Sequence, residues 1–192
     1  ASLQSRDRYG HTCLVSGATW GLRGRSFDSV DDGIATPYTS YAAPHTILTW
    51  VQSNSLAPAT SKFIVDNSPG ATGFMLRQES GGATVTAYVY YTVAGLKDRS
   101  VTLPNTNFHL ITVTWTNTTF SIAINNGTFN TSTFTSDTVI NPNDTMEIGR
   151  NIELGANASW GGVIGEVQVL SGRAINFLEK NRYYESTKWR FV

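Results

Sequence analysis

The sequence predicts an all-β protein, an antiparallel two-sheet jelly-roll β-sandwich with one short C-terminal helix. Short segments rich in β-branched and aromatic residues recur along the chain, and turn-forming residues separate them. A convincing helical pattern occurs at residues 174–184, where Ile175, Leu178 and Tyr183 would line one side of a helix. A sandwich of this size is commonly one domain, so we expect a single domain over residues 1–192.

The expected strands are the segments in which apolar, β-branched and aromatic residues concentrate: residues 46–51, 62–65, 84–93, 109–115, 120–124 and 162–170. In residues 109–115 and 120–124 the residue classes alternate, so that one face packs while the other meets solvent. The pair Asn126 and Gly127 follows and fits a tight hairpin, because both residues tolerate positive φ.

Composition excludes several classes of function. The formal net charge is zero and 15% of the residues are charged, against about 25% in a typical domain, so we expect no nucleic-acid partner and no acidic membrane surface. No apolar run reaches the roughly 18 to 20 residues of a membrane span. The N-terminal residues lack the apolar core of a signal peptide, so we expect a protein used without secretion or one whose leader was removed.

Six segments carry a recognisable order of motifs: residues 24–33, 46–51, 107–115, 120–127, 146–149 and 165–169. Together they resemble the laminin-G-like branch of the concanavalin A-like lectin/glucanase superfamily. The first segment is similar to that family's G-x-x-F-D-G-x-D-D pattern, with Ser29 in place of the usual glycine. The resemblance extends over about residues 10 to 180 and implies two curved antiparallel sheets packed face to face.

Residues 8–12 and 17–20 resemble modules common in bacteriophage and environmental microbial proteins. This resemblance implies a non-enzymatic surface or decoration module of a bacteriophage virion, made in the host cytoplasm and docked on capsid or tail proteins. We expect residues 1–8 and 186–192 to be docking or strand-pairing arms, and their association with a partner lattice would favour a homo-oligomer on the particle. Loops of the module could touch host glycans. The alternative is a carbohydrate-binding, lectin-like module of a secreted or adhesive protein, with an extracellular location.

No catalytic constellation is visible, and we expect no enzyme activity. Glucanases of the superfamily carry an E-x-D-x-x-E strand that aims its acids into a cleft, and this chain has no such run. Glu147 and Glu153 are isolated in the sequence. Glu166 falls where the family pattern has a glutamate in its final strand, and we expect a structural role for it. A Gly-x-Ser-x-Gly nucleophile elbow is also absent.

Asp28, Asp31 and Asp32 are the candidate metal ligands. They place three carboxylates beside Gly33, and calcium is bound by several oxygens on one loop. Calcium is therefore the one cofactor that the sequence suggests. The alternative is a turn without any cofactor, in which the aspartates accept hydrogen bonds from local backbone N–H groups.

Trp160, Tyr88, Tyr90 and Asn157 are the candidate glycan-binding residues. Tyr88 and Tyr90 share one face of their strand and Tyr91 takes the other. Trp160 and Asn157 lie in a turn-rich segment, where an indole could stack on a sugar. The alternatives are tyrosines that pack across a sheet and a tryptophan that closes the end of the core.

Overall fold

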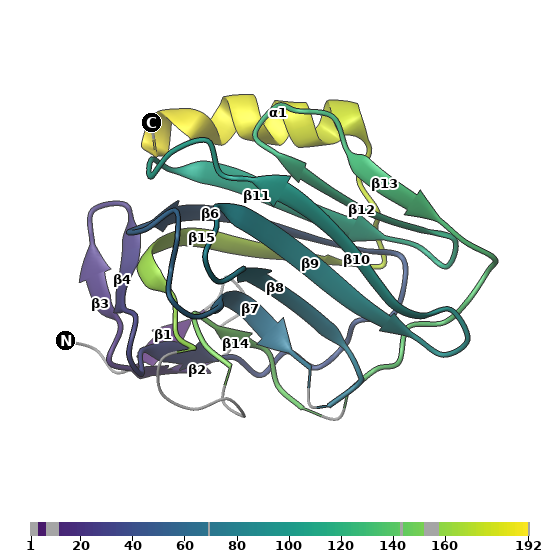
Figure 1. Ribbon diagram of the computed structural model, residues 1–192, viewed down its shortest axis with the longest axis horizontal. Coiled ribbons are helices and arrows are strands. Elements are labelled where there is room, and N and C mark those ends of the chain that lie inside the picture. The colour runs from purple at the N-terminus through teal and green to yellow at the C-terminus, as the bar shows by residue number, and fades with distance from the viewer. Residues whose placement is uncertain (1–3, 7–11, 69, 143, 152–157, 192) are drawn as a thin grey trace.

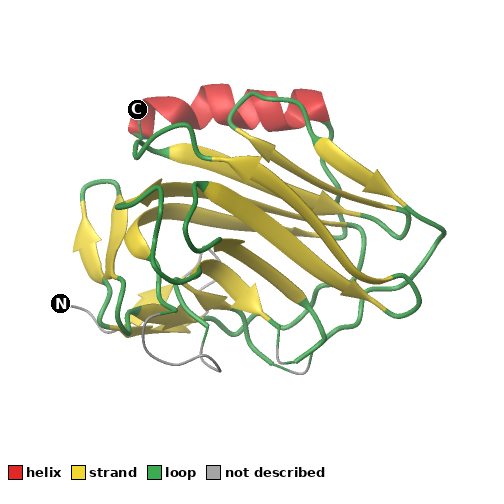
Figure 2. Ribbon diagram, in the orientation of Figure 1, coloured by secondary structure: helices red, strands yellow, loops and turns green. Residues whose placement is uncertain are grey.

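The computed structural model describes residues 4–6, 12–68, 70–142, 144–151 and 158–191 (Figure 1). Two antiparallel sheets pack face to face, and one α-helix lies against the outside of one of them (Figures 1 and 2). This confirms the all-β, two-sheet sandwich with a short C-terminal helix that the sequence predicts. No helix among these residues is long and apolar enough to cross a membrane.

Sheet 1 has the strand order β1 (Gln4–Arg6), β2 (Thr12–Ser16), β5 (Gly33–Ala35), β14 (Glu147–Ile148), β7 (Lys62–Asn67), β8 (Phe74–Gln78), β9 (Thr84–Tyr91) and β10 (Gly95–Thr102). Sheet 2 has the order β13 (Asn130–Thr133), β12 (Thr119–Ile124), β11 (His109–Trp115), β6 (His45–Ser53), β15 (Gly161–Ser171), β4 (Gly24–Asp28) and β3 (Thr19–Gly21). Each of the six strands expected from the sequence coincides with or overlaps one of these strands.

The main core lies between the two sheets and takes alternate residues from their facing strands. Phe74 of sheet 1 and Trp115 of sheet 2 are fully buried, and their rings stack with centroids 5.1 Å apart. The indole N–H of Trp115 donates to the carbonyl of Tyr41 at 3.1 Å, so this large ring is buried without an unpaired donor.

The turn between β12 and β13 differs in detail from the expected hairpin. Asn125 has a φ of +51°, whereas the sequence predicts positive φ at Asn126 and Gly127. Gly127 closes the turn by donating its backbone N–H to the carbonyl of Ile124 at 2.9 Å. The left-handed residue is therefore one position earlier than expected, at an asparagine, which tolerates this region well.

Helix α1 (Phe177–Thr187) begins at an Asn176 N-cap, in a capping box completed by Glu179. This start determines which side faces the sheet: Lys180 is fully buried and Leu178 is 65% exposed. The expected inward position of Leu178 is therefore wrong. Ile175 is buried as predicted, but it precedes the helix.

A second apolar cluster fills the space between α1 and the outer face of sheet 2: Leu48, Trp50, Phe108, Leu110, Ile175 and Phe191. The ring of Phe191 stacks on that of Trp50 with centroids 4.8 Å apart, and the indole of Trp50 donates to the Thr187 hydroxyl. The chain end up to Phe191 thus packs on its own domain instead of extending as the arm expected at 186–192.

At the other end of the chain, Gln4–Arg6 pairs with Thr12, Cys13 and Leu14 of the same molecule. The described part of the arm expected at residues 1–8 is therefore a strand of sheet 1. Residues 1–3, 7–11 and 192 lie outside the described residues. Because α1 covers sheet 2, the outer face of sheet 1 is the sheet face that the described helix leaves open (Figure 1).

Candidate functional site

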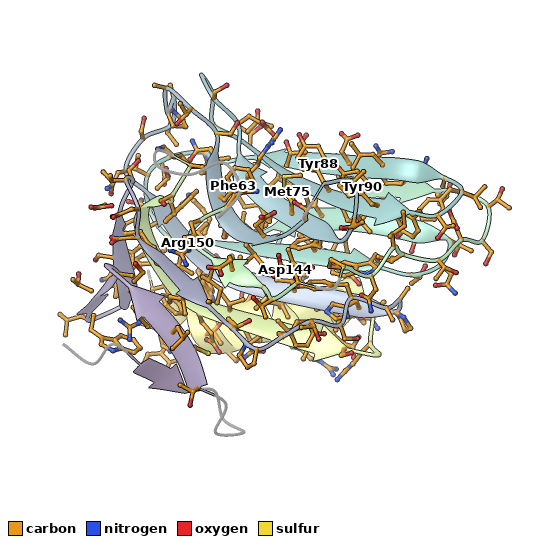
Figure 3. All side chains as sticks on the ribbon, turned by 90° about the horizontal axis from the view of Figure 1, so that it is seen from below. Phe63, Met75, Tyr88, Tyr90, Asp144 and Arg150 are labelled. Atoms are coloured by element: carbon orange, nitrogen blue, oxygen red, sulfur yellow. The ribbon has the colours of Figure 1, made fainter. Side chains whose placement is uncertain are left out.

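The outer face of sheet 1 brings a group of partly exposed aromatic and polar side chains together. Alternate residues of a strand share a face, and the register places Met75 between Asp66 of β7 and Tyr88 of β9. Figure 3 looks onto this face and labels Phe63, Met75, Tyr88 and Tyr90 on it. Tyr88 and Tyr90 are both partly exposed there, whereas Tyr91 is buried and donates its hydroxyl to the Thr116 carbonyl at 3.0 Å.

Arg77, Glu79 and Tyr88 form a polar network on this face. Glu79 Oε1 accepts from the Tyr88 hydroxyl at 2.7 Å and from Nε of Arg77 at 3.1 Å. Arg77 Nη2 also contacts the Tyr88 hydroxyl at 3.3 Å. The guanidinium carbon lies 4.9 Å from the Tyr88 ring centroid and 5.7 Å from that of Phe63, so aromatic rings flank the charge.

The network holds its members in defined protonation states. Burial by itself would raise the pKa of Glu79, but hydrogen bonds from Tyr88 and Arg77 outweigh it and lower the pKa below its usual value. Burial, and then donation to Glu79, raises the pKa of Tyr88. At neutral pH this face therefore presents a carboxylate, a guanidinium and a neutral phenol, which are donors and acceptors suited to a hydroxyl-rich ligand.

Trp160 does not contribute to this face. It is fully buried in the main core, and its indole N–H contacts the carbonyl of Gln52 at 3.3 Å. Its backbone N–H bonds to the carbonyl of Gly149, which ties it into the sandwich. The structure thus corrects the prediction of a sugar-stacking indole, because no face of the ring reaches solvent. Asn157, the fourth candidate, lies outside the described residues.

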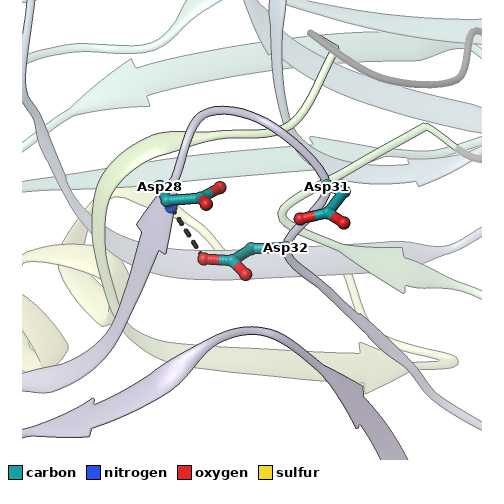
Figure 4. Close-up of side chains that lie close together, drawn as sticks. All are labelled: Asp28, Asp31 and Asp32. Atoms are coloured by element: carbon teal, nitrogen blue, oxygen red, sulfur yellow. Dashed lines mark hydrogen bonds between the residues drawn. The ribbon is translucent and has the colours of Figure 1, made fainter.

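Asp28, Asp31 and Asp32 are brought together at the β4–β5 turn (Figure 4), where one oxygen of each lies within 4.8 Å of the others. Asp32 Oδ2 accepts from the backbone N–H of Asp28 at 2.7 Å, and Asp28 Oδ1 accepts from that of Val30 at 2.8 Å. Ser29, in the position where the family pattern has glycine, adopts a φ of +76°. Two of the three carboxylates therefore already organise the turn.

Burial is the largest cause of the pKa shifts of Asp32 and Lys62 at this turn. Burial raises the pKa of Asp32, helped by the charges of Asp28 and Asp31 and opposed by the hydrogen bond from the Asp28 backbone. Nζ of Lys62 donates to the Ser29 carbonyl at 3.1 Å and brings a positive charge close to Asp28. The three carboxylates could ligate a calcium ion, but the local hydrogen bonds account for the folding of this turn without one.

The structure also pairs two acids that are far apart in the sequence. Glu147 of β14 lies directly opposite Asp66 of β7 on the outer face of sheet 1, so its sequence isolation does not carry over to the fold. Asp66 accepts from Ser68 at 2.6 Å and from Asn151 at 2.8 Å, and Glu147 pairs with Arg150 at 2.9 Å. Each acid is held by polar partners, an arrangement that favours a structural role over proton transfer.

Glu166 has the structural role expected from its position. Its carboxylate accepts from Gln168 at 2.7 Å and from Arg190 at 2.9 Å. The second contact ties β15 to the segment that follows α1.

The family assignment rests on a match over most of the chain. Residues 28–176 match the laminin-G family model described as the concanavalin A-like lectin/glucanases superfamily. The chain belongs to this superfamily. The matched residues begin at the first aspartate of the β4–β5 turn and end at the N-cap of α1, so they include both candidate sites. No curated protein matches the chain.

Solved structures with this superfamily fold include toxin domains. The botulinum neurotoxin serotype D binding domain matches with a TM-score of 0.73 and 12% identity, over 93% of this chain and 47% of that one. The botulinum neurotoxin type G receptor-binding domain matches with a TM-score of 0.69 and 15% identity, over 93% and 47%. This chain spans about half the length of those domains, and at such identity the likeness shows the fold alone.

Proposed function

We propose that this superfamily member is a carbohydrate-binding, lectin-like module that holds a glycan against the outer face of sheet 1. The observation that carries the proposal is the Arg77–Glu79–Tyr88 network on that face, with Tyr90 on the same strand. The carbon faces of sugar rings stack on aromatic rings, and sugar hydroxyls pair with carboxylates and guanidinium groups.

The form of the face indicates weak, non-catalytic binding. Tyr88 and Tyr90 are only partly exposed and lie on a sheet surface, so a glycan would remain largely solvated. Such contacts offset only part of the cost of association, and we expect dissociation constants between about 1 µM and about 1 mM. Asp66, Glu79 and Glu147 on this face are held in ion pairs and hydrogen bonds, and we propose binding without bond cleavage.

Decoration of a bacteriophage particle is a second candidate, and one observation favours it. Three large apolar side chains are exposed on the α1 side of the molecule: Phe177 is 40%, Leu178 65% and Trp189 74% exposed. This side is opposite the open face of sheet 1 (Figure 1). A module docked on viral structural proteins through α1 would therefore present the proposed glycan face outward. Co-sedimentation with assembled particles, lost in Trp189→Ala, tests this candidate.

A glycan array, run with calcium and again with a chelator, tests the proposed function. Any glycan bound is then titrated against Tyr90→Ala and Glu79→Gln, which alter the open face. Each variant is expected to lower the affinity about tenfold, the value of one stacked ring or one charged hydrogen bond.

Trp189→Ala is the matched control, because it removes an exposed aromatic side chain from the opposite side of the molecule. It should leave the glycan affinity unchanged. Binding that survives both open-face variants, or silence on every glycan, would remove the support for a lectin-like role of this face.

A further inference from the structure

Arg25 of β4 is a buried cation with incomplete hydrogen bonding. The residue is 3% exposed, and its Nη1 donates to the carbonyl of Ala18 at 2.9 Å. Its Nε and Nη2 atoms are buried and have no hydrogen-bond partner. Burial lowers the pKa of this guanidinium. A buried charge without its hydrogen bonds is costly, so these two nitrogens are the feature of Arg25 that needs an explanation.

The two unpaired nitrogens point to one ligand chemistry. Nε and Nη2 form one edge of the planar guanidinium, and their N–H groups are parallel. This edge matches the two oxygens of a carboxylate, which binds it in a bidentate manner. The third nitrogen of Arg25 is already used by the Ala18 carbonyl, so the guanidinium is held in place with its carboxylate-binding edge unoccupied.

The indole ring of Trp20 packs against this guanidinium. It lies directly opposite Arg25 in the β3–β4 register, and the guanidinium carbon is 4.1 Å from its ring. The indole is 62% exposed, and β3 is a three-residue strand at the end of sheet 2 with all its residues exposed. An exposed ring on a short edge strand can rotate away from the cation at little cost in packing.

We propose that Trp20 and Arg25 form a second binding site, specific for a sugar acid. The carboxylate pairs with Nε and Nη2 of Arg25, and the sugar ring stacks on the indole of Trp20 once the indole has rotated aside. This site lies at the edge of sheet 2, apart from Tyr88 and Tyr90 on sheet 1. It does not depend on the proposed glycan face, and either site can fail without the other.

The test is a titration of the full chain, followed by NMR at the Arg25 Nε–H group and the Trp20 indole N–H group. Three probes separate the contributions: galacturonate carries acid and ring, galactose the ring alone, and acetate the acid alone. Galacturonate is expected to shift both signals to saturation. Acetate should bind about tenfold more weakly, because it lacks the stacked ring, and galactose should leave the Arg25 signal unmoved.

Variants complete the test. Trp20→Ala should reduce the affinity for galacturonate to that for acetate. Arg25→Lys keeps the positive charge but lacks the two parallel N–H groups that pair with a carboxylate, so it should remove the saturable shift of the Trp20 indole N–H signal. Tyr90→Ala is the control and should leave both shifts intact.

Absence of a saturable Arg25 shift at about 50 mM galacturonate overturns the proposal. Equal affinity for galacturonate and acetate, or an equal Arg25 shift with galactose, overturns the sugar-acid specificity. If Arg25→Lys does not fold, Trp20→Ala and the three probes still decide.

Discussion

The hydroxyl of Tyr88 donates to Oε1 of Glu79 at 2.7 Å, across the junction of β8 and β9 on the open face of sheet 1. The same oxygen accepts from Nε of Arg77 at 3.1 Å. One carboxylate oxygen therefore holds both the phenol and the guanidinium in place. Because such charge-assisted bonds fix side-chain geometry, this face is ordered before any ligand arrives.

Tyr88→Phe tests this relationship directly. Loss of the phenol should raise the pKa of Glu79 toward its ordinary value, because one of the hydrogen bonds that stabilise the carboxylate disappears. Carbon-detected NMR titration of the Glu79 carboxyl measures this change. Tyr90→Phe is the control and should leave the pKa of Glu79 where it is. An unchanged pKa in Tyr88→Phe would mean that Tyr88 does not stabilise the carboxylate and that its other partners, Arg77 among them, are sufficient.

His45 should make the protein acid-sensitive. It is fully buried, with its ring stacked on Trp115 at 4.6 Å, and burial lowers its pKa to about 4. In the unfolded chain its pKa is about 6.5, so the unfolded state binds more protons between these values. The contribution of His45 to the free energy of unfolding should be constant above about pH 6.5 and fall by on the order of 3 kcal/mol toward pH 4.

Urea unfolding of the wild type and of His45→Phe across this range measures the effect. The phenylalanine variant should lose part of its stability at neutral pH, because the contact of Nε2 with the Tyr38 hydroxyl at 3.2 Å is gone. Its stability should depend less on pH between 6.5 and 4. Parallel pH profiles for the two proteins would show that His45 is not the group responsible.

Lys180 should produce an effect of the same sign at high pH. Its Nζ donates to the carbonyls of Asn125 and Gly127 at 2.8 and 2.6 Å, and burial lowers its pKa to about 8. The unfolded chain, with a lysine pKa of about 10.4, binds more protons above pH 8. The free energy of unfolding should therefore rise between about pH 8 and 10.5. Lys180→Met should lack this rise in urea unfolding, and an identical rise in both proteins would contradict the assignment.

Trp160→Ala should lower the stability of the protein without lowering its affinity for a glycan. The fully buried indole fills the main core, and its removal should cost about 3–5 kcal/mol by leaving a cavity. Below its unfolding transition the variant should bind any glycan as well as the wild type, because the indole does not reach the surface. Chemical unfolding and a glycan titration at low temperature measure the two quantities. A selective loss of affinity without a loss of stability would return Trp160 to the binding site.

Asp32→Asn should destabilise the β4–β5 turn with or without calcium. The substitution weakens the bond from the Asp28 backbone N–H to the Asp32 carboxylate, at a cost of about 1–2 kcal/mol. Asp31→Asn is the control, and its exposed side chain should contribute less than about 0.5 kcal/mol. Thermal unfolding in calcium and in chelator measures both. A cost that appears for both variants only in calcium would identify a bound cation instead.

Local sequence patterns were sufficient to assign side chains to the two faces of a strand. The separation of Tyr88 and Tyr90 from Tyr91 follows from the two-residue period of a strand. The solvent-facing side expected for β11 is wrong, because all the residues of β11 are buried and the second apolar cluster covers its outer face. The helix shows the limit of such patterns. Its apolar residues suggested Leu178 as an inward position, yet the capping box at Asn176 begins the helix where Lys180 faces the sheet and Leu178 faces solvent.

Some contacts at the candidate sites could likewise be predicted from the sequence, and others could not. The aspartates of the β4–β5 turn are neighbours in sequence, and their clustering could be predicted. Asp66 and Glu147 could not be paired from the sequence, because 80 residues separate them and only the sheet register places them opposite each other. The burial of Trp160 likewise depends on packing against residues from distant strands, whereas its sequence context suggested an exposed loop.

The sequence by itself determined the all-β sandwich, its superfamily and the strand faces, because these depend on residue periodicity and turn chemistry within short windows. Only the tertiary structure decided which residues meet: Arg77 with Tyr88, Arg25 with Trp20, and Lys180 with the β12–β13 turn. These contacts depend on strand order, register and helix position, which are determined by packing across the whole chain.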